Sequence, residues 1–271
     1  MSIWQSATLT VAGLPIHYHR TGGDGPPLVL VHGFSDNGAC WTRLARDLAA
    51  DYDIIMPDAR GHGASARIVP GEAPDLLGDL VGFIAALGLE RPALLGHSMG
   101  ATTAADYAAH YPQQVRALLL EDPPWREQAD LDEEAETRRE AYRAHLKEMQ
   151  AQSQAELEAL AHAQHPDWHA LELGPWAESK RQLDLRFLDS PLAWWRPWRE
   201  VARKIACPTL LITGDIDRGA IVTPEIAAEA LTLLAQGELC HLPGAGHSIR
   251  RERYTAYLAA VRDFLARTVE L

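Results

Sequence analysis

The chain has 271 residues, of which 47% are hydrophobic and 23% are charged, the proportions of an ordinary soluble globular protein. Its formal net charge of −12 argues against nucleic acid as a partner, because phosphate binding needs a basic face, and it equally disfavours an anionic membrane surface. The length lies slightly above the usual upper size for one hydrophobic core, so we expect one domain that carries an insertion rather than two independent domains.

The first residues and the cysteines indicate a cytoplasmic protein. The opening segment MSIWQSATLT has no basic start followed by an apolar stretch, as a signal peptide would have. No run approaches the roughly 18 apolar residues that a membrane span requires. The cysteines Cys40, Cys207 and Cys240 lie far apart, which favours buried reduced thiols over a disulfide framework or a zinc site.

The pattern of short apolar runs and longer helical segments predicts an α/β fold. Residues 7–22 resemble an antiparallel hairpin that turns at Ala12-Gly13. The following apolar runs are typical of parallel strands, which are covered on both faces: Leu28–Gly33, Asp53–Asp58, Ala93–Ser98, Ala117–Asp122, Thr209–Asp215 and Glu238–Gly244. Helix-like segments alternate with them: Trp41–Ala50, Asp75–Leu87, Met99–His110, Pro224–Ala235 and Ile249–Arg267. Together they predict a mostly parallel, doubly wound sheet of about eight strands.

The alternation breaks after Asp122, and residues 123–203 read as helices without a convincing strand. We therefore predict a core domain of residues 1–122 and 204–271, with residues 123–203 inserted before the last two core strands as a helical cap. Six of the eight tryptophans fall in this insertion: Trp125, Trp168, Trp176, Trp194, Trp195 and Trp198. We expect most of them to pack the cap onto the core, with the alternative that two or more line a ligand pocket.

A serine lies between two glycines where one strand ends and a helix begins, in the segment Gly96-His97-Ser98-Met99-Gly100. The pattern G-x-S-x-G in this context is the nucleophile elbow, a turn so tight that the flanking positions must be small. A serine is also a common helix N-cap, which is the competing interpretation. The context favours Ser98 as a nucleophile.

A nucleophilic serine needs a base, and the base needs a carboxylate. Of the 12 histidines, His247 is the best candidate, because it follows the last strand on a glycine-rich loop. His97 is next to the serine, so its side chain should point elsewhere, and His32 is expected to shape its loop through hydrogen bonds. For the acid we prefer Asp217, with Asp122 as the rival, since both follow strand ends.

Five segments in this order resemble the α/β-hydrolase superfamily: VHGFSDNGACW, DARGHGAS, GHSMG, CPTLLITGDIDRG and PGAGHSIRRE. The resemblance covers nearly all of the chain outside 123–203. It implies the order nucleophile, acid, histidine, which Ser98, Asp217 and His247 match. The acid usually lies three residues after a glycine, as Asp217 follows Gly214, but some members place it after the strand that precedes the cap, which keeps Asp122 open.

The resemblance also implies an oxyanion hole made by the backbone N–H groups of Phe34 and Met99. Dehalogenases and epoxide hydrolases of this superfamily carry an aspartate at the elbow, so Ser98 argues against both activities. We expect a serine hydrolase that uses no cofactor or metal and cleaves an ester, lactone or thioester of a small to medium-sized, largely apolar molecule. A C–C bond hydrolase of ring-fission products and a non-catalytic ligand receptor are the alternatives.

The substrate's charge and the oligomeric state stay open at this point, with a monomer or a homodimer expected. Three arginines of the insertion could meet a substrate carboxylate, although surface exposure is the more ordinary interpretation of each: Arg126, Arg186 and Arg196.

Overall fold

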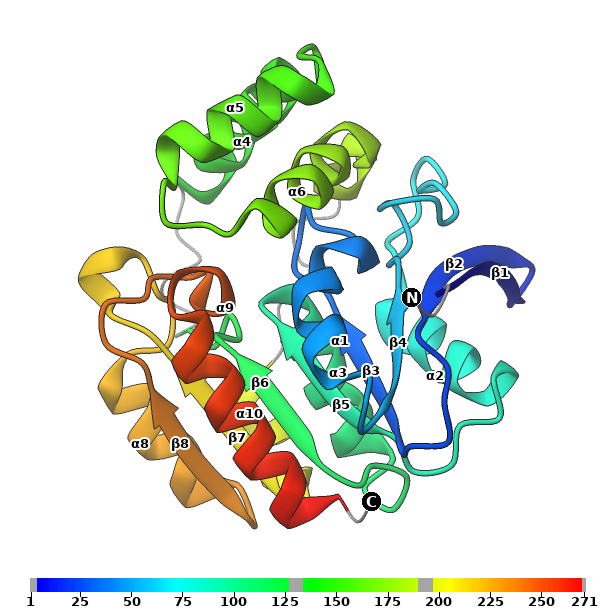
Figure 1. Cartoon of the computed structure of the whole chain (residues 1–271), viewed down its shortest axis with the longest axis vertical. Helices are drawn as coiled ribbons and strands as arrows, with labels where there is room; N and C mark the ends of the chain where they lie inside the picture. Colours follow the sequence, from blue (N-terminus) through cyan, green and yellow to red (C-terminus); the bar gives the residue numbers. More distant parts are fainter. Residues whose placement is uncertain (1–3, 127–133, 190–196, 270–271) are drawn as a thin grey trace.

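An eight-stranded sheet forms the centre of the molecule in this computed structural model, which describes residues 4–126, 134–189 and 197–269 (Figure 1). The strands are β1 (Gln5–Val11), β2 (Leu14–Arg20), β3 (Pro27–Val31), β4 (Asp53–Pro57), β5 (Ala93–His97), β6 (Leu118–Glu121), β7 (Thr209–Thr213) and β8 (Gly237–His241). They lie in the order β1-β2-β4-β3-β5-β6-β7-β8. Strands β3 to β8 run parallel, whereas the hairpin β1–β2 joins β4 in antiparallel fashion. The predicted α/β sheet is confirmed.

Both faces of the sheet are covered, as the continuous apolar runs require. Along β3, Leu28 and Leu30 pack into one hydrophobic cluster, and Val29 and Val31 pack into the cluster on the opposite face. The first cluster lies under α1 (Thr42–Leu48) and α10 (Tyr254–Thr268). The second lies under α2 (Leu76–Ala86), α3 (Met99–His110), α7 (Trp198–Lys204) and α8 (Pro224–Leu233).

Of the two helices that adjoin the site, α3 has its predicted bounds and the final helix does not. Helix α3 is buried along nearly its whole length, because its alanines let it lie close to the sheet. The predicted final helix is divided at Arg253, whose φ of −130° and ψ of 44° are not helical. The short α9 (Ile249–Glu252) thus becomes separate from α10.

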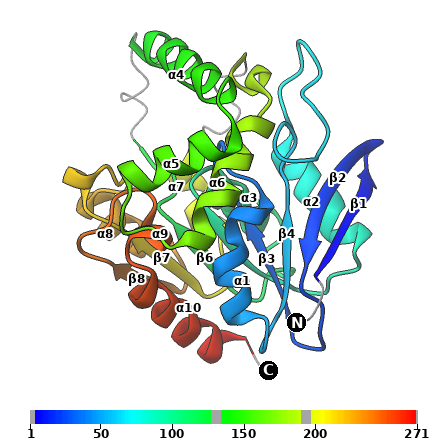
Figure 2. The same cartoon turned by 45° about the horizontal axis from the view of Figure 1, so that its top comes forward.

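Three helices between β6 and β7 lie over the carboxyl ends of the strands: α4 (Glu134–Gln150), α5 (Gln154–Gln164) and α6 (Ala170–Gln182) (Figures 1 and 2). With the short 3-10 helix η3 (Leu185–Asp189) they share a hydrophobic cluster of their own. We call residues 134–189 the cap. None of the helices in the described ranges is long and apolar enough to cross a membrane.

The ends of the predicted insertion behave differently from the cap. Trp125 and Trp198 stack with ring centroids 5.2 Å apart, and both belong to the core cluster beneath α3. Helix α7 therefore packs with the core rather than with α4, α5 and α6. Trp194, Trp195 and Arg196 lie outside the described residues.

Candidate active site

Ser98 occupies a strained turn between β5 and α3. Its φ of 52° and ψ of −118° are rarely adopted by residues other than glycine. A Cβ atom at Gly96 would lie 2.4 Å from the carbonyl oxygen of Gly100, and one at Gly100 would lie 2.1 Å from that of Val31. Only glycine fits either position. The Ser98 side chain makes no capping hydrogen bond with α3, so the N-cap interpretation is not met.

A cavity of about 590 Å³ lies between the cap and the carboxyl ends of the strands. Ser98, Phe34 and His247 line it from the core. The cap contributes Tyr142, His145, Leu146, Met149, Gln164, Trp176 and Lys180. Trp168 is buried within the cap, so Trp176 is the one tryptophan of the described ranges that lines this cavity. The alternative of several pocket tryptophans is not supported by these ranges.

His247 forms a hydrogen bond with Asp122, which directly follows β6. Its Nδ1 lies 2.6 Å from Oδ2 of Asp122, whose side chain is fully buried. The other oxygen, Oδ1, accepts hydrogen bonds of 3.0 Å from the backbone N–H groups of Ile221 and Val222. The N–H of Ile221 also lies 2.9 Å from Oδ2. These donors fix the carboxylate, which in turn fixes the imidazole.

The preference for Asp217 as the carboxylate beside His247 is therefore corrected. Asp217 lies on the exposed 3-10 helix η4 (Ile216–Arg218), and no hydrogen bond joins it to His247. The loop after β7 is held differently: Asp215 accepts a hydrogen bond from the N–H of Gly244 and pairs with His241. This anchoring turns the next residues toward solvent. The rival residue, Asp122, occupies the place beside the histidine.

Two further histidines support the loops of the site. His97 donates a 2.9 Å hydrogen bond from Nε2 to the backbone oxygen of His247. Burial and the nearby Arg250 guanidinium hold the pKa of His97 well below its ordinary value, so the ring is neutral. His32 donates from Nδ1 to the carbonyl of Gly33 and accepts from the N–H of Ala59, which is the loop-shaping role expected of it.

Phe34 and Met99, the two predicted oxyanion donors, both line the cavity. Met99 is the first residue of α3, so its N–H has no acceptor within the helix. Phe34 lies in a tight turn after β3, closed by a 3.1 Å hydrogen bond from the N–H of Asp36 to the carbonyl of Gly33.

A buried ionic network adjoins the site, and the sequence analysis did not identify it. Asp36 forms ion pairs with Lys180 of the cap and with Arg250 and Arg251 of α9. Burial opposes ionisation of Asp36, but these three cations hold the pKa of its carboxyl well below the usual range. The sequence did contain a signal for this network. Arg250 and Arg251 lie in the first turn of a helix, where positive charge interacts unfavourably with the helix dipole, so another interaction must account for them.

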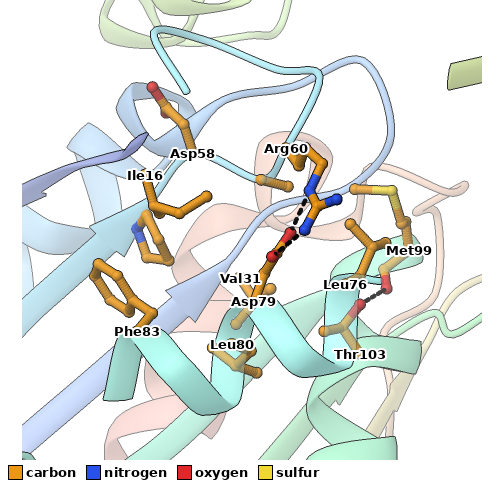
Figure 3. A pocket seen from close by; sticks show the side chains of 12 residues that line it. Ile16, Val31, Asp58, Arg60, Leu76, Asp79, Leu80, Phe83, Met99 and Thr103 are labelled. Carbon is orange, nitrogen blue, oxygen red and sulfur yellow. Dashed lines mark hydrogen bonds and ion pairs between the residues drawn. The ribbon is translucent and has the colours of Figure 1, made fainter. Parts of the chain in front are cut away.

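A second, smaller cavity of about 40 Å³ is lined by the Arg60–Asp79 ion pair and by Met99, the residue after Ser98 (Figure 3). Its walls are apolar side chains of α2 and β3 together with Thr103, whose hydroxyl donates to the carbonyl of Met99. Among the described residues, Met99 is the one that lines both cavities. Ser98 and His247 do not line the smaller cavity, so the larger one is the candidate site.

Comparison with known proteins agrees with the fold. A family model described as alpha/beta hydrolase fold matches residues 26–252. The chain is 39% identical over 119 residues to the N-formylmaleamate deformylase of Pseudomonas putida, a match that spans 41% of this chain and 42% of the relative. It is 29% identical over 258 residues to the 2-(acetamidomethylene)succinate hydrolase of Mesorhizobium japonicum, covering 91% and 90%.

Among solved structures, the N-formylmaleamic acid deformylase of Pseudomonas putida S16 superimposes with a TM-score of 0.79 at 22% identity. The superposition covers 95% of this chain and 100% of the other. At this level of identity the likeness concerns the fold alone.

Proposed function

The chain belongs to the α/β-hydrolase fold family, and from this we propose that it is a serine hydrolase that cleaves an acyl bond of a small, carboxylate-bearing molecule. The observation that carries the proposal is the 2.6 Å hydrogen bond between His247 and the buried Asp122, in a cavity that also exposes Ser98 on its strained turn. A nucleophile, a base and an acid from three strand ends are the parts that acyl transfer needs.

The proposed reaction begins with His247. Because Asp122 accepts a hydrogen bond from Nδ1–H, the proton of the neutral imidazole stays on Nδ1 and Nε2 carries the lone pair. Nε2 then takes the proton of the Ser98 hydroxyl as the oxygen attacks the substrate carbonyl. The N–H groups of Phe34 and Met99 stabilise the resulting oxyanion. The leaving group departs with the proton from His247. Water, deprotonated by the same histidine, then hydrolyses the acyl-serine and releases the acid.

We propose an ester as the first candidate for the bond that is cleaved and an amide as the second candidate. The same steps serve both, since only the leaving atom changes from oxygen to nitrogen. The relative named N-formylmaleamate deformylase supports the second candidate, because its name describes removal of a formyl group from nitrogen.

A substrate panel tests the bond assignment. We expect wild-type protein to hydrolyse p-nitrophenyl acetate, with p-nitroacetanilide turned over more slowly because its leaving group is poorer. The panel includes a vinylogous 1,5-diketone as substrate for C–C cleavage. A higher kcat/KM on the diketone than on every ester and amide would reassign the reaction, and no turnover of any compound would support a receptor.

The charge of the cavity wall supports a substrate carboxylate. Arg126 and Arg251 line the cavity, as does Lys180, whose N–H donors are directed at Ser35 and Asp36. Asp36 is the one aspartate or glutamate among the described lining residues. The two arginines are thus the candidates for pairing with a substrate carboxylate. Glu121 and Glu172, which pair with Arg250 and Arg251, do not line the cavity. The cationic side of the network thus faces the substrate. Arg186, by contrast, pairs with Asp184 and is not among the lining residues.

We expect monoethyl succinate to be hydrolysed with a kcat/KM about tenfold or more above that of ethyl pentanoate, which replaces the carboxylate by an ethyl group. One charge-assisted hydrogen bond, of about 1.5–3 kcal/mol, is enough for this ratio. A pH-stat assay at fixed ionic strength measures both rates. Equal rates, or a preference for the neutral ester, would remove the carboxylate from the proposal and leave the acyl chemistry intact.

A further inference from the structure

The loop that carries Phe34 is held by residues from three distant parts of the chain. Asp36, two residues after Phe34, accepts hydrogen bonds of 2.9 Å from Arg250 and Arg251, which lie shortly after His247. Arg250 also donates its backbone N–H to Glu121, the neighbour of Asp122. The turn with the predicted oxyanion donor is thereby tied to the segments of the base and the acid.

The third attachment comes from the cap. Lys180 of α6 is 5% exposed, and its ammonium group has three acceptors. They are the carbonyl oxygen of Ser35 at 2.7 Å, the hydroxyl of Ser35 at 2.9 Å and Oδ1 of Asp36 at 3.2 Å. All three N–H donors of the ammonium group are thus directed at the two residues that follow Phe34.

The backbone at Ser35 depends on contacts with other parts of the chain to keep its conformation. Ser35 has a φ of 63°, in the left-handed region that non-glycine residues seldom occupy. Its N–H has only a 3.3 Å hydrogen bond to Nε2 of His62. Lys180 fixes the direction of the Ser35 carbonyl and so the peptide planes of the turn, on which the direction of the Phe34 N–H depends.

We propose that Lys180 is a positioning residue: the cap supplies an ammonium group that holds residues 34–36 so that the Phe34 N–H points at the oxyanion. The inference rests on the proposed function, because it assumes that an oxyanion forms beside Ser98. It makes the cap a structural part of the oxyanion hole as well as the roof of the cavity.

Removal of the Lys180 ammonium group is expected to leave the protein folded, so that an effect on catalysis can be measured. Burial of an ion pair gives little net stability, because desolvation of both charges offsets their attraction. Asp36 keeps both arginines when Lys180 is removed, so no carboxylate is left uncompensated. A neutral side chain of similar length therefore preserves the fold and changes the turn.

Lys180→Met tests the inference, with Lys147→Met as the matched control. Lys147 is an exposed lysine of α4 in the same cap, and it does not line the cavity. The assay measures kcat and KM on the best ester of the panel, the Ki of phenylboronic acid and the melting temperature. Phenylboronic acid forms a tetrahedral adduct with a nucleophilic serine and reports on the oxyanion hole.

For Lys180→Met we expect kcat to fall about 10- to 100-fold, somewhat less than for complete loss of an oxyanion donor. The Ki of phenylboronic acid rises at least tenfold, while KM stays within threefold of the wild-type value. Lys147→Met leaves all four quantities unchanged. Unchanged kcat and Ki in a folded Lys180→Met protein would overturn the inference, as would a rise in KM alone.

If Lys180→Met does not fold, Ser35→Gly replaces it. Glycine accepts the positive φ without strain and removes one of the three acceptors of Lys180. The expected result is a smaller fall in kcat with the same rise in Ki, and unchanged values overturn the inference. The Ser98→Ala variant distinguishes a failure of this inference from a failure of the proposed function. Turnover that survives in Ser98→Ala would refute the proposed function, independently of the result for Lys180→Met.

Discussion

Replacement of Ser98 by alanine is expected to lower kcat by about 10⁴-fold or more, because no other group can form the acyl intermediate. The hydroxyl makes no capping hydrogen bond, and alanine meets the same backbone strain at a φ of 52°, so the fold should be unaffected. Steady-state assays on p-nitrophenyl acetate measure the loss. Mass spectrometry after treatment with diethyl p-nitrophenyl phosphate should find the added phosphoryl group on wild-type protein and not on the variant.

Ser6→Ala is a suitable control, because Ser6 is exposed on β1 and does not line the cavity. This variant should keep both turnover and labelling. Retention of near-full turnover by Ser98→Ala would refute the assignment of the nucleophile and, with it, the proposed reaction.

The second large effect is expected for Asp122→Asn, with a fall in kcat of about 10⁴-fold at neutral pH. The N–H of Val222 donates to Oδ1 alone, the oxygen of Asp122 that does not face His247, so the amide oxygen of asparagine takes that side. The N–H of Ile221, which reaches both oxygens of Asp122, can keep the same acceptor. The amide NH₂ then faces His247 and donates to Nδ1. This forces the proton of the imidazole onto Nε2, where it can no longer accept the proton of Ser98.

Asparagine is well suited to this test for another reason. Asp122 has a φ of 42°, and asparagine tolerates the left-handed region better than most residues. The loss can therefore be assigned to the tautomer of His247 and not to the backbone.

Asp217→Asn is the control for this prediction, with an expected change in kcat of less than about threefold, because surface substitutions away from a site have small effects. Circular dichroism and the melting temperature establish that both variants are folded. A larger loss in Asp217→Asn than in Asp122→Asn would mean that the loop after β7 rearranges when substrate binds. Small losses in both would remove the carboxylate from the mechanism.

The sheet could be predicted because its strands obey a simple physical rule. A strand covered on both faces must be apolar at every position, as Leu28–Val31 and Leu118–Leu120 are. The elbow was readable for a similar reason, since Gly96 and Gly100 each have a backbone carbonyl within 2.4 Å of where a Cβ atom would lie. Local sterics of this kind leave a direct trace in the sequence.

The partner of His247 could not be chosen in this way. Asp122 and Asp217 both follow strand ends, and their local sequences do not reveal which one turns inward. The decision depends on the contacts of Asp215 with Gly244 and His241, which join segments that are distant in the sequence. The network around Asp36 escaped prediction for the same reason, because Lys180 and Arg251 become neighbours only through the fold.

The partners of Asp36 lie far from it in the sequence, and this affects the order in which parts of the protein fold. Lys180 lies 144 residues after Asp36, and Arg251 lies 215 residues after it. Contacts between such distant residues form late, since the chain between them must first be ordered. During synthesis, the turn of Phe34 emerges from the ribosome long before its cap lysine and both arginines. A nascent chain can therefore complete the candidate site only after residue 251 has left the ribosome and is free to join the fold.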